Sequence, residues 1–215
     1  MNRPMFVNDL ASKWLPEVPD VHQRLVAGPP ARVADMACGC GWSSISLARG
    51  YPTVVVHGID ADEQSVVKAR ENAADAGVAD RVTFTVADVC DSGLEGPYDA
   101  AFLFEALHDL ARPVEALRSI GALLGPRGSL VVADERVGET FTAPGDDAER
   151  LMYGFSILHC LPASRATTPS AAIGTVLRPD AVRRLAEDAG FGSFDVLPIE
   201  NDLWRFYRLA NPGKV

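Results

Sequence analysis

The sequence lacks any long run of apolar residues. No stretch approaches the roughly 20 consecutive apolar residues that a helix needs to cross a bilayer. The first residues, MNRPMFVNDL, are interrupted by Pro4, Asn8 and Asp9, whereas a secretion signal needs an unbroken apolar core. We therefore expect no membrane partner and a cytoplasmic location.

Basic residues are too few to balance the acidic ones. The chain has 20 Lys and Arg against 29 Asp and Glu, which gives a formal net charge of -9. A chain of this charge is repelled by the phosphates of nucleic acids and by anionic membrane surfaces. We therefore predict no nucleic-acid partner, whereas a small-molecule substrate is compatible with the charge.

Cysteines are too few for an extracellular disulfide framework. The chain of 215 residues has four, at positions 38, 40, 90 and 160. Cys38 and Cys40 stand close together in DMACGCGWSS, but two thiolates alone do not complete a tetrahedral metal site. No Cys-x-x-Cys or paired His motif supplies further ligands. We expect small buried side chains here and no metal.

Short apolar runs alternate with helical patterns along most of the sequence. This alternation is typical of an α/β protein whose mainly parallel sheet carries helices on both faces. Seven strands are predicted: Ala31 to Ala37, Thr53 to Ile59, Arg81 to Val86, Tyr98 to Phe104, Gly128 to Asp134, Phe194 to Pro198 and Leu203 to Leu209. The predicted helices are Trp42 to Arg49, Asp62 to Ala76, Arg112 to Leu124, Asp146 to His159 and Pro179 to Ala189.

The domain organisation follows from the same pattern. We predict one domain over residues 1–215, with an N-terminal helical cap at 1–27. The alternation loosens after the fifth strand, where acidic, Pro and Gly residues interrupt it. Residues 135–177 are therefore predicted to form an insertion on the substrate side of the sheet.

The loop after the first strand has the features of a site for an adenosine-type cofactor. Gly39 and Gly41 allow the backbone to approach a ligand, and the helix from Trp42 points its positive end toward it. Asp60 follows the second strand, 19 residues past Gly41, where a carboxylate can accept both hydroxyls of a ribose. Nicotinamide dinucleotides and S-adenosylmethionine both fit these two features.

Three residues favour S-adenosylmethionine. Ser44 stands where a nicotinamide-binding fingerprint has its third glycine. Asp88 after the third strand can accept from an adenine amino group, and Asp35 before the glycine loop can serve an amino-acid ammonium. A nicotinamide-dependent reductase is the weaker alternative, because the sequence also lacks a Tyr-x-x-x-Lys pair.

Four segments in order resemble motifs of class I S-adenosylmethionine-dependent methyltransferases. They are VADMACGCG (33–41), HGIDAD (57–62), VADV (86–89) and YDAAFLFEALHDL (98–110). The resemblance covers about residues 31–135 and implies a Rossmann-like fold and S-adenosylmethionine as cofactor. It implies that Asp35, Gly39 and Gly41 contact the methionine half, Asp60 the ribose, and Asp88 with the Val89 backbone the adenine. The full predicted set adds Ala37, Ala61, Phe104 and Glu105.

Ala37 departs from the family pattern, which usually has a glycine at this position. Alanine costs little if its φ is negative, and of order 1 kcal/mol or more if its φ is positive. Cofactor binding is then expected to be weakened or slightly shifted at most, and Ala37→Gly should leave or improve the affinity.

The C-terminal segments ERLMYGFSILHCLP and IENDLWRFYRL resemble a bacterial subgroup of small-molecule-type methyltransferases. Members of that subgroup often carry an N-terminal winged-helix-like region, which we do not expect in this chain. Methylation of nucleic acid is not favoured either, because no Asn/Asp-Pro-Pro-Tyr-type motif follows the fourth strand.

A methyltransferase positions the acceptor and, where the acceptor is a hydroxyl, removes its proton. His108 follows the fourth strand and is the candidate base; the alternative is a histidine that only contacts cofactor or backbone. Trp14, Tyr153 and His159 are candidate substrate contacts, with packing as the alternative role.

We therefore predict an enzyme that transfers a methyl group from S-adenosylmethionine to a small-molecule acceptor. Oxygen, nitrogen, carbon and sulfur acceptors all stay open, and we make no prediction of oligomeric state. The alternative is a protein that binds S-adenosylmethionine without turnover, as a sensor or a partner subunit.

Overall fold

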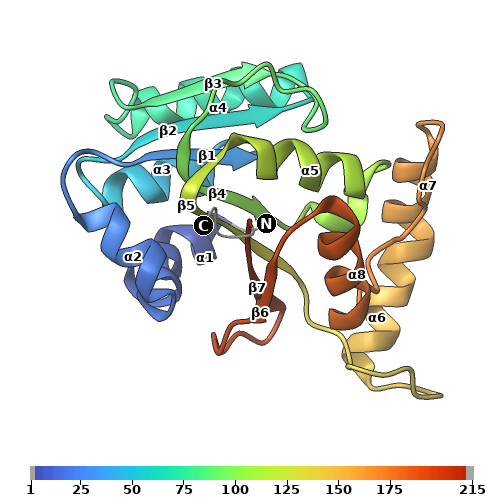
Figure 1. Cartoon of the computed structure of the whole chain (residues 1–215). Coiled ribbons are helices and arrows are strands. Elements are labelled where there is room, and N and C mark those ends of the chain that lie inside the picture. The colour runs from blue at the N-terminus through green and yellow to red at the C-terminus, as the bar shows by residue number, and fades with distance from the viewer. Residues whose placement is uncertain (1–2, 212–215) are drawn as a thin grey trace.

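The fold is built on a single twisted sheet, as the computed structural model shows for residues 3–211 (Figure 1). The strands are β1 (Arg32–Met36), β2 (Val55–Asp60), β3 (Val82–Val86), β4 (Tyr98–Phe104), β5 (Leu124–Glu135), β6 (Ser193–Val196) and β7 (Trp204–Ala210). Their order is β3-β2-β1-β4-β5-β7-β6, and β7 is antiparallel to both neighbours. The other six strands are parallel, which confirms the predicted Rossmann-like seven-stranded sheet. The chain reverses direction across the sheet between β1 and β4, where ligands bind in open α/β folds.

Helices cover both faces of this sheet. They are α1 (Arg3–Met5), η1 (Phe6–Trp14), η2 (Leu15–Glu17), α2 (Pro19–Val26), α3 (Trp42–Gly50), α4 (Glu63–Asp75), η3 (Leu107–Asp109), α5 (Pro113–Leu123), α6 (Asp147–Phe155), η4 (Ser156–Cys160), α7 (Leu161–Arg165) and α8 (Pro179–Ala189). The N-terminal helices, α3 and α4 pack on one face, whereas α5 and α8 pack on the other. In Figure 1, α6 and α7 stand beside α8, on the opposite side of the molecule from α2.

The central strands are apolar on both sides because both faces are covered. In β1, Val33 belongs to the core under the N-terminal helices and α3, and Ala34 to the core under α5. Successive side chains of a strand point to opposite faces, so a strand buried on both faces needs a continuous apolar run. This is why β1 and β4 could be recognised from sequence.

Helix ends follow the local sequence signals. Asp62 accepts the backbone N–H of Ser65 at 2.9 Å before α4, and Asp146 accepts that of Glu149 at 2.7 Å before α6. Gly190 ends α8 in a left-handed conformation with φ +98°. The helix predicted over Asp146 to His159 is longer in the structure, because helical backbone continues through η4 and α7 to Arg165.

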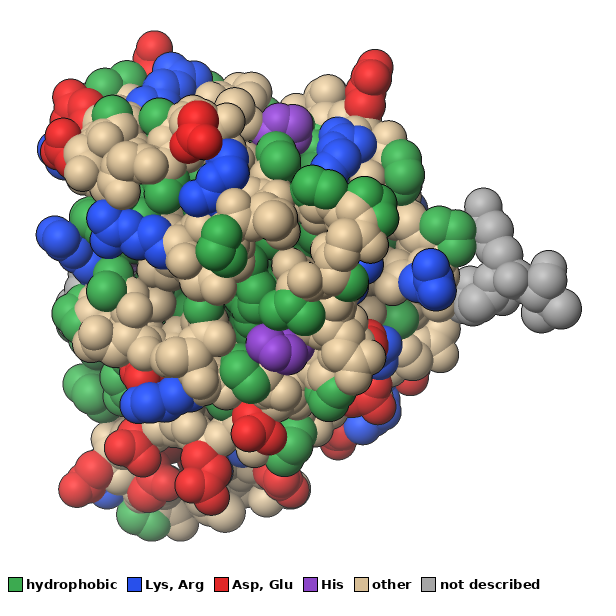
Figure 2. Space-filling model, turned by 90° about the vertical axis from the view of Figure 1, so that its left-hand side faces the viewer, with side chains coloured by type: hydrophobic (Ala, Val, Ile, Leu, Met, Phe, Trp, Pro, Cys, Tyr) green, Lys and Arg blue, Asp and Glu red, His purple; other side chains and the backbone are tan. Residues whose placement is uncertain are grey.

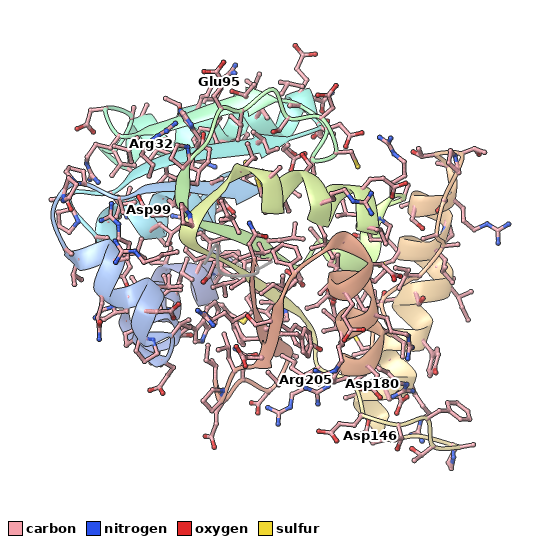
Figure 3. All side chains as sticks on the ribbon, in the orientation of Figure 1. Arg32, Glu95, Asp99, Asp146, Asp180 and Arg205 are labelled. Carbon is pink, nitrogen blue, oxygen red and sulfur yellow. The ribbon has the colours of Figure 1, made fainter. Side chains whose placement is uncertain are left out.

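The N-terminal helices are fixed to the amino ends of the strands by charged groups. Arg24 of α2 donates to both carboxylate oxygens of Asp99 in β4, at 2.6 and 2.9 Å. The backbone N–H of Arg32 donates to the same carboxylate at 2.9 Å, and Figure 3 shows Arg32 and Asp99 at this end of the sheet. Such two-pronged Arg–carboxylate pairs constrain geometry as well as adding energy. Residues 3–26 thereby form a helical layer against the sheet.

No helix among residues 3–211 is long and apolar enough to span a membrane. On the face drawn in Figure 2, acidic and basic side chains are interspersed with hydrophobic ones over most of the surface. That face carries no continuous basic surface of the kind that binds nucleic-acid phosphates.

Candidate active site

The glycine loop after β1 opens onto a cavity of about 510 Å³. Its lining comes from the N-terminal helices, the loop, the start of α3 and the end of β4: Arg3, Phe6, Asp35, Ala37, Cys38, Gly39, Cys40, Trp42, Ser43, Phe104 and Glu105. The volume lies in the range of small-molecule and cofactor sites. The position, at the carboxyl ends of β1 and β4, is the one expected for the ligand of this fold.

Asp35 is the buried acidic group of this cavity. Its Oδ2 accepts hydrogen bonds from the hydroxyls of Ser43, at 2.6 Å, and Ser44, at 2.5 Å. Burial raises the pKa of Asp35 to about 6, although the two serine hydroxyls act in the opposite direction. The residue that replaces a third glycine, Ser44, is therefore a hydrogen-bond donor that holds this carboxylate in place.

The two glycines of the loop have different roles. Gly39 has φ +51°, and a Cβ placed on it would have no described atom within 4 Å outside the adjacent residues. Its missing side chain therefore leaves open space at the cavity wall. Gly41 has φ +79°, and a Cβ there would lie 2.6 Å from Phe84 Cζ. Contrary to the expectation from sequence, the open side of Gly41 faces the protein core and not the ligand.

Ala37 has φ +57° and lies in the left-handed region. The sequence left open whether φ at this position, where the family has a glycine, is negative or positive. It is positive, so the alternative in which alanine carries a conformational cost applies. An alanine in this conformation is strained by about 1–2 kcal/mol relative to right-handed backbone. Ala37 also lines the cavity.

Asp60 is tied to the glycine loop. Its Oδ2 accepts the backbone N–H of Gly39 at 2.7 Å, and its Oδ1 accepts that of Asp62 at 2.9 Å. Each carboxylate oxygen has a second lone pair, so these bonds fix the group and leave capacity for ribose hydroxyls. Ala61, the next residue, is exposed at the same strand end.

Asp88 lies at the end of β3 with its side chain more than half exposed. Its oxygens accept the backbone N–H of Cys90 at 2.8 Å and the guanidinium of Arg112 at 3.0 Å. These donors, first the Cys90 N–H, lower the pKa of Asp88. An adenine amino group bound here has to share the carboxylate with Arg112, whereas Val89 is buried beside it.

Glu105 is the strained residue at the end of β4. Its φ is +54°, and its Oε2 is buried without a hydrogen-bond partner among residues 3–211. Burial, followed by the negative charge of Glu135, raises the pKa of Glu105 to about 7. Phe104 packs beneath it against Phe6, with ring centres 5.6 Å apart. Both Phe104 and Glu105 line the cavity, as expected.

His108 is buried, 3% exposed, and its ring is held by two acidic residues at the end of β5. Nδ1 donates to Asp134 Oδ1 at 2.6 Å, and the His108 backbone N–H lies 3.2 Å from Asp134 Oδ2. Glu135 Oε2 lies 2.9 Å from the same Nδ1 but forms no hydrogen bond, because the single N–H is directed at Asp134. Burial alone lowers the pKa of His108, but the two carboxylates outweigh it and raise the pKa far above its usual value. The two carboxylates therefore favour the protonated, imidazolium form of His108.

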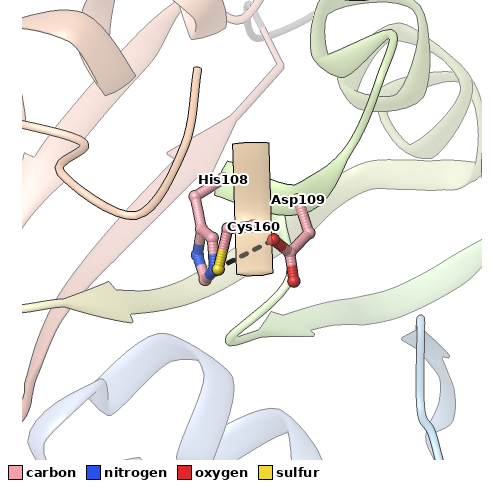
Figure 4. A group of neighbouring side chains, drawn as sticks. All are labelled: His108, Asp109 and Cys160. Carbon is pink, nitrogen blue, oxygen red and sulfur yellow. Dashed lines mark ion pairs between the residues drawn. The ribbon is translucent and has the colours of Figure 1, made fainter. Parts of the chain in front are cut away.

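The other ring nitrogen of His108 faces a second group of side chains (Figure 4). Nε2 lies 3.3 Å from Asp109 Oδ1, and Cys160 of η4 offers its sulfur to the same place, with all three atoms within 4.8 Å of one another. These donor types can bind zinc. Metal binding here would require His108 to release its proton.

None of the three candidate substrate contacts is in the lining of the cavity. Trp14 is 3% exposed and packs against Trp204 and Phe206, with ring centres 5.4 and 5.0 Å apart. Its role is to anchor η1 in the core, which corrects the interpretation as a substrate contact. Tyr153 faces α8 and receives a hydrogen bond from Arg178 at 3.4 Å, and His159 is exposed. The side of this helix that faces the site carries Cys160 instead.

Comparison with known proteins identifies the family. A family model described as a methyltransferase domain matches residues 29–190, which is most of the chain. The chain belongs to this methyltransferase family. The expected class, a class I S-adenosylmethionine-dependent methyltransferase, is thereby confirmed, and with it S-adenosylmethionine as the cofactor of the family.

Relatives of this methyltransferase domain include two curated proteins. The 27-O-demethylrifamycin SV methyltransferase of Amycolatopsis mediterranei is 31% identical over 121 residues, 56% of this chain and 44% of that protein. The ubiquinone biosynthesis O-methyltransferase of Caulobacter sp. is 32% identical over 102 residues, 47% of this chain and 40% of that protein. The chain thus spans less than half the length of either relative.

A solved structure has the same fold. The O-methyltransferase NcsB1 from neocarzinostatin biosynthesis, in complex with S-adenosyl-L-homocysteine and 1,4-dihydroxy-2-naphthoic acid, is 18% identical. It matches with a TM-score of 0.66 over 94% of this chain and 52% of that chain. At this identity the similarity is one of fold.

The residues of the cavity fit S-adenosylmethionine, a cation with an amino-acid end. Asp35 and the unpartnered Oε2 of Glu105 supply negative groups, and Gly39 leaves room where a Cβ would project. Asp60, fixed between two backbone N–H groups, supplies the acceptor expected for a ribose. Opposite charges and a shaped wall are what such a ligand requires.

Reasoning from sequence missed several residues of this site. Asp134 and Glu135 are the last two residues of β5, so the expectation that residues at strand ends line the site also applies to them. Cys160 reaches His108 from a helix 52 positions away, and Arg3 lies 32 positions before Asp35. No local signal connects either residue to the site, because both contacts exist only in the folded chain.

Proposed function

We propose that this methyltransferase domain transfers a methyl group from S-adenosylmethionine to an oxygen of a small molecule that binds as its oxyanion, which the protonated His108 stabilises. The observation that carries the proposal is the hydrogen bond from His108 Nδ1 to Asp134 Oδ1, 2.6 Å long, at the carboxyl end of the sheet. It aligns the imidazole and stabilises its protonated form, so that Nε2–H can donate a hydrogen bond to an acceptor oxygen that has lost its proton to solvent.

The charge state of His108 favours an oxyanion as the reacting acceptor. Asp134 and Glu135 raise the pKa of His108, so the proton stays on the imidazole while the acceptor oxygen is ionised. Nε2–H is then directed at that oxygen, and Nδ1–H remains with Asp134. An oxyanion attacks a methyl group far more readily than a neutral hydroxyl does, so this division of charge lowers the barrier.

Residues of the cavity and of the neighbouring strand ends would hold the methyl donor. Asp35 and Glu105, which line the cavity, would bind its methionine end. Asp60 would bind the ribose, and Asp88 and Val89 the adenine. When bound, S-adenosylmethionine supplies an electrophilic methyl group on a positively charged sulfur. Glu105 connects the two parts of the site, because it lines the cavity and its carboxyl is influenced by the charges of His108 and Glu135.

Access of the acceptor to His108 requires movement of η4. The ring is 3% exposed, and Cys160 of η4 packs beside Nε2. An acceptor can approach Nε2 only when η4 shifts outward, so we expect acceptor binding to open this helix. Helical segments that cover a site commonly move in this way when ligands enter.

A small molecule is the proposed acceptor class. The two curated relatives are named for small-molecule O-methylation, and NcsB1 is described with a dihydroxynaphthoic acid. The net charge of -9 also disfavours nucleic acid. Phenols, including dihydroxynaphthoic acids, are therefore the first acceptors to test.

The test is turnover with a panel of phenols, followed by mass spectrometry of the methylated product, alongside titration with S-adenosylhomocysteine. His108→Gln should lower kcat by about 10²–10⁴ while leaving S-adenosylhomocysteine affinity unchanged. His159→Gln is the matched control, because this histidine is exposed on η4 and should leave both quantities unchanged.

Three outcomes would contradict the proposal in whole or in part. A folded protein that fails to bind S-adenosylhomocysteine excludes the cofactor assignment. Tight binding with no methyl consumption across the panel favours the alternative, a sensor or partner subunit. Full activity in His108→Gln would show that His108 does not stabilise the acceptor oxyanion, while leaving methyl transfer itself intact.

A further inference from the structure

Among residues 3–211, one basic side chain lines the cavity beside the glycine loop. Arg3 comes from α1, and its guanidinium carbon lies 3.8 Å from the centre of the Trp42 ring. Trp42 is the first residue of α3, immediately after Gly41. We propose that Arg3 binds the carboxylate of the cofactor's methionine moiety, held in place by Trp42. This inference rests on the proposed binding of S-adenosylmethionine and names the residue that recognises its carboxylate.

The charge distribution of the cavity supports this role. An amino-acid end carries both an ammonium and a carboxylate, so its site needs groups of both signs. Asp35 and Glu105 are acidic and can serve only the ammonium and the sulfonium. Arg3 is the basic side chain in the cavity lining, and the amino end of the nine-residue helix α3 adds partial positive charge next to it.

The N–H groups of Arg3 are available to donate hydrogen bonds to a ligand. Among residues 3–211, Arg3 forms no ion pair or side-chain hydrogen bond that meets the usual distance limits. Stacking on Trp42 uses the flat face of the guanidinium and leaves the N–H groups at its edge available. A carboxylate is the group that this edge binds best, through two parallel hydrogen bonds.

The N-terminal helix is packed tightly enough to define where Arg3 lies. Phe6 contacts Phe104 and Trp204, with ring centres 5.6 and 5.5 Å apart. A Cβ on Gly50 would lie 2.1 Å from Ala11 Cβ, so η1 and α3 approach each other as closely as a glycine permits. The segment that carries Arg3 is therefore fixed against the helix that carries Trp42.

The alternative role of Arg3 is structural: it stacks on Trp42 and stabilises the N-terminal helix without touching a ligand. The two roles make different predictions for ligands that differ only in the carboxylate. S-adenosylhomocysteine has this group, whereas its decarboxylated analogue, S-adenosyl-3-thiopropylamine, keeps the adenosine, the sulfur and the amine.

The experiment is calorimetric titration of both ligands into the wild type and Arg3→Met, whose side chain can still cover Trp42. The wild type should bind S-adenosylhomocysteine about 10–100-fold more tightly than the analogue, as expected for a charge-assisted pair. In Arg3→Met this preference should fall to within about threefold, because only the carboxylate-bearing ligand loses a contact. Arg3→Lys should keep part of the preference, and Arg127→Met, at an exposed arginine, should keep all of it.

Each result has one meaning. Equal weakening of both ligands in Arg3→Met, or an unchanged preference, overturns the assignment of Arg3 and leaves the proposed function standing. Failure of the folded wild type to bind either ligand contradicts the proposed function itself. Thermal unfolding of each variant checks that the comparison is made between folded proteins.

Discussion

The carboxylate of Asp60 accepts the backbone N–H of Gly39 at 2.7 Å, across the gap between the ends of β2 and β1. The predicted ribose-binding residue is therefore also a support of the loop that holds the methionine half. Asp62 donates to the other oxygen of Asp60 at 2.9 Å, so the carboxylate cannot rotate freely. The two halves of the cofactor site are joined by one side chain.

Replacement of Asp60 by Ala should reduce both binding and loop order. Loss of its charged hydrogen bonds should weaken S-adenosylhomocysteine binding by about 1.5–3 kcal/mol, measured by calorimetry. Asp80→Ala is the control, because Asp80 is an exposed residue before β3 and should leave the affinity unchanged. Equal affinities for the wild type and Asp60→Ala would show that the ribose binds elsewhere.

Ala37→Gly should stabilise the fold. Ala37 has φ +57°, so glycine relieves strain, and we expect a gain of about 1 kcal/mol in the free energy of unfolding. Cofactor affinity should stay the same or improve. Ala79→Gly, in an exposed turn without positive φ, should instead lose about 0.4–1 kcal/mol through unfolded-state entropy. Urea denaturation measures the free energy of unfolding of both variants. A value for Ala37→Gly below that of the wild type would show that Ala37 is not strained.

Alanine at the two loop glycines should separate folding from binding. Gly39→Ala places a methyl group at the cavity wall, so it should weaken cofactor binding and cost about 1–2 kcal/mol of stability. Gly41→Ala adds a clash, with Phe84 Cζ at 2.6 Å, and should cost about 2–5 kcal/mol. Denaturation curves paired with titration test this, and the idea fails if Gly39→Ala proves the less stable variant.

Glu105 should make the stability of the cofactor-free protein depend on pH. Its pKa is raised from 4.5 to about 7, first by burial and then by the charge of Glu135. Between these values the folded state holds a proton that the unfolded chain has released, so the free energy of unfolding falls as pH rises from about 4.5 to 7.

Glu105→Gln removes this titration. Its free energy of unfolding should fall less steeply with pH than that of the wild type. The two slopes should differ by at most the contribution of one bound proton. Urea denaturation at several pH values between 4.5 and 7.5 gives the two slopes. Parallel curves would mean that Glu105 ionises normally in the fold.

Much of the fold could be predicted because its signals are local. The apolar runs of β1 and β4, Asp62 as the start of α4 and Gly190 as the end of α8 are each recognised within a few residues. Strand ends in a parallel sheet meet at one edge, which is why Asp35 and Glu105 were expected near one cavity, and both line it. Periodicity did not show where the helix from Asp147 ends, because no glycine or proline ends the helical backbone before Arg165.

Orientation of single side chains was harder to predict. Trp14 and His159 were expected at a substrate pocket; one is packed in the core, and the other is exposed. Trp14 lies on a helix whose rotation is set by packing against Trp204 and Phe206 of β7, a contact that the local sequence does not encode. The same holds for Gly41, whose open side is filled by Phe84 from β3.

The sequence by itself determined the family, the positions of the strands along the chain and the acidic groups at their ends. These depend on periodicity and on short motifs, which act over a few residues. Only the tertiary structure decided that Ala37 is strained, that His108 is charged by Asp134 and Glu135, and that Arg3 lies over Trp42. Backbone strain, shifted pKa values and stacking depend on which atoms from distant segments come together, and that is fixed only when the chain has folded.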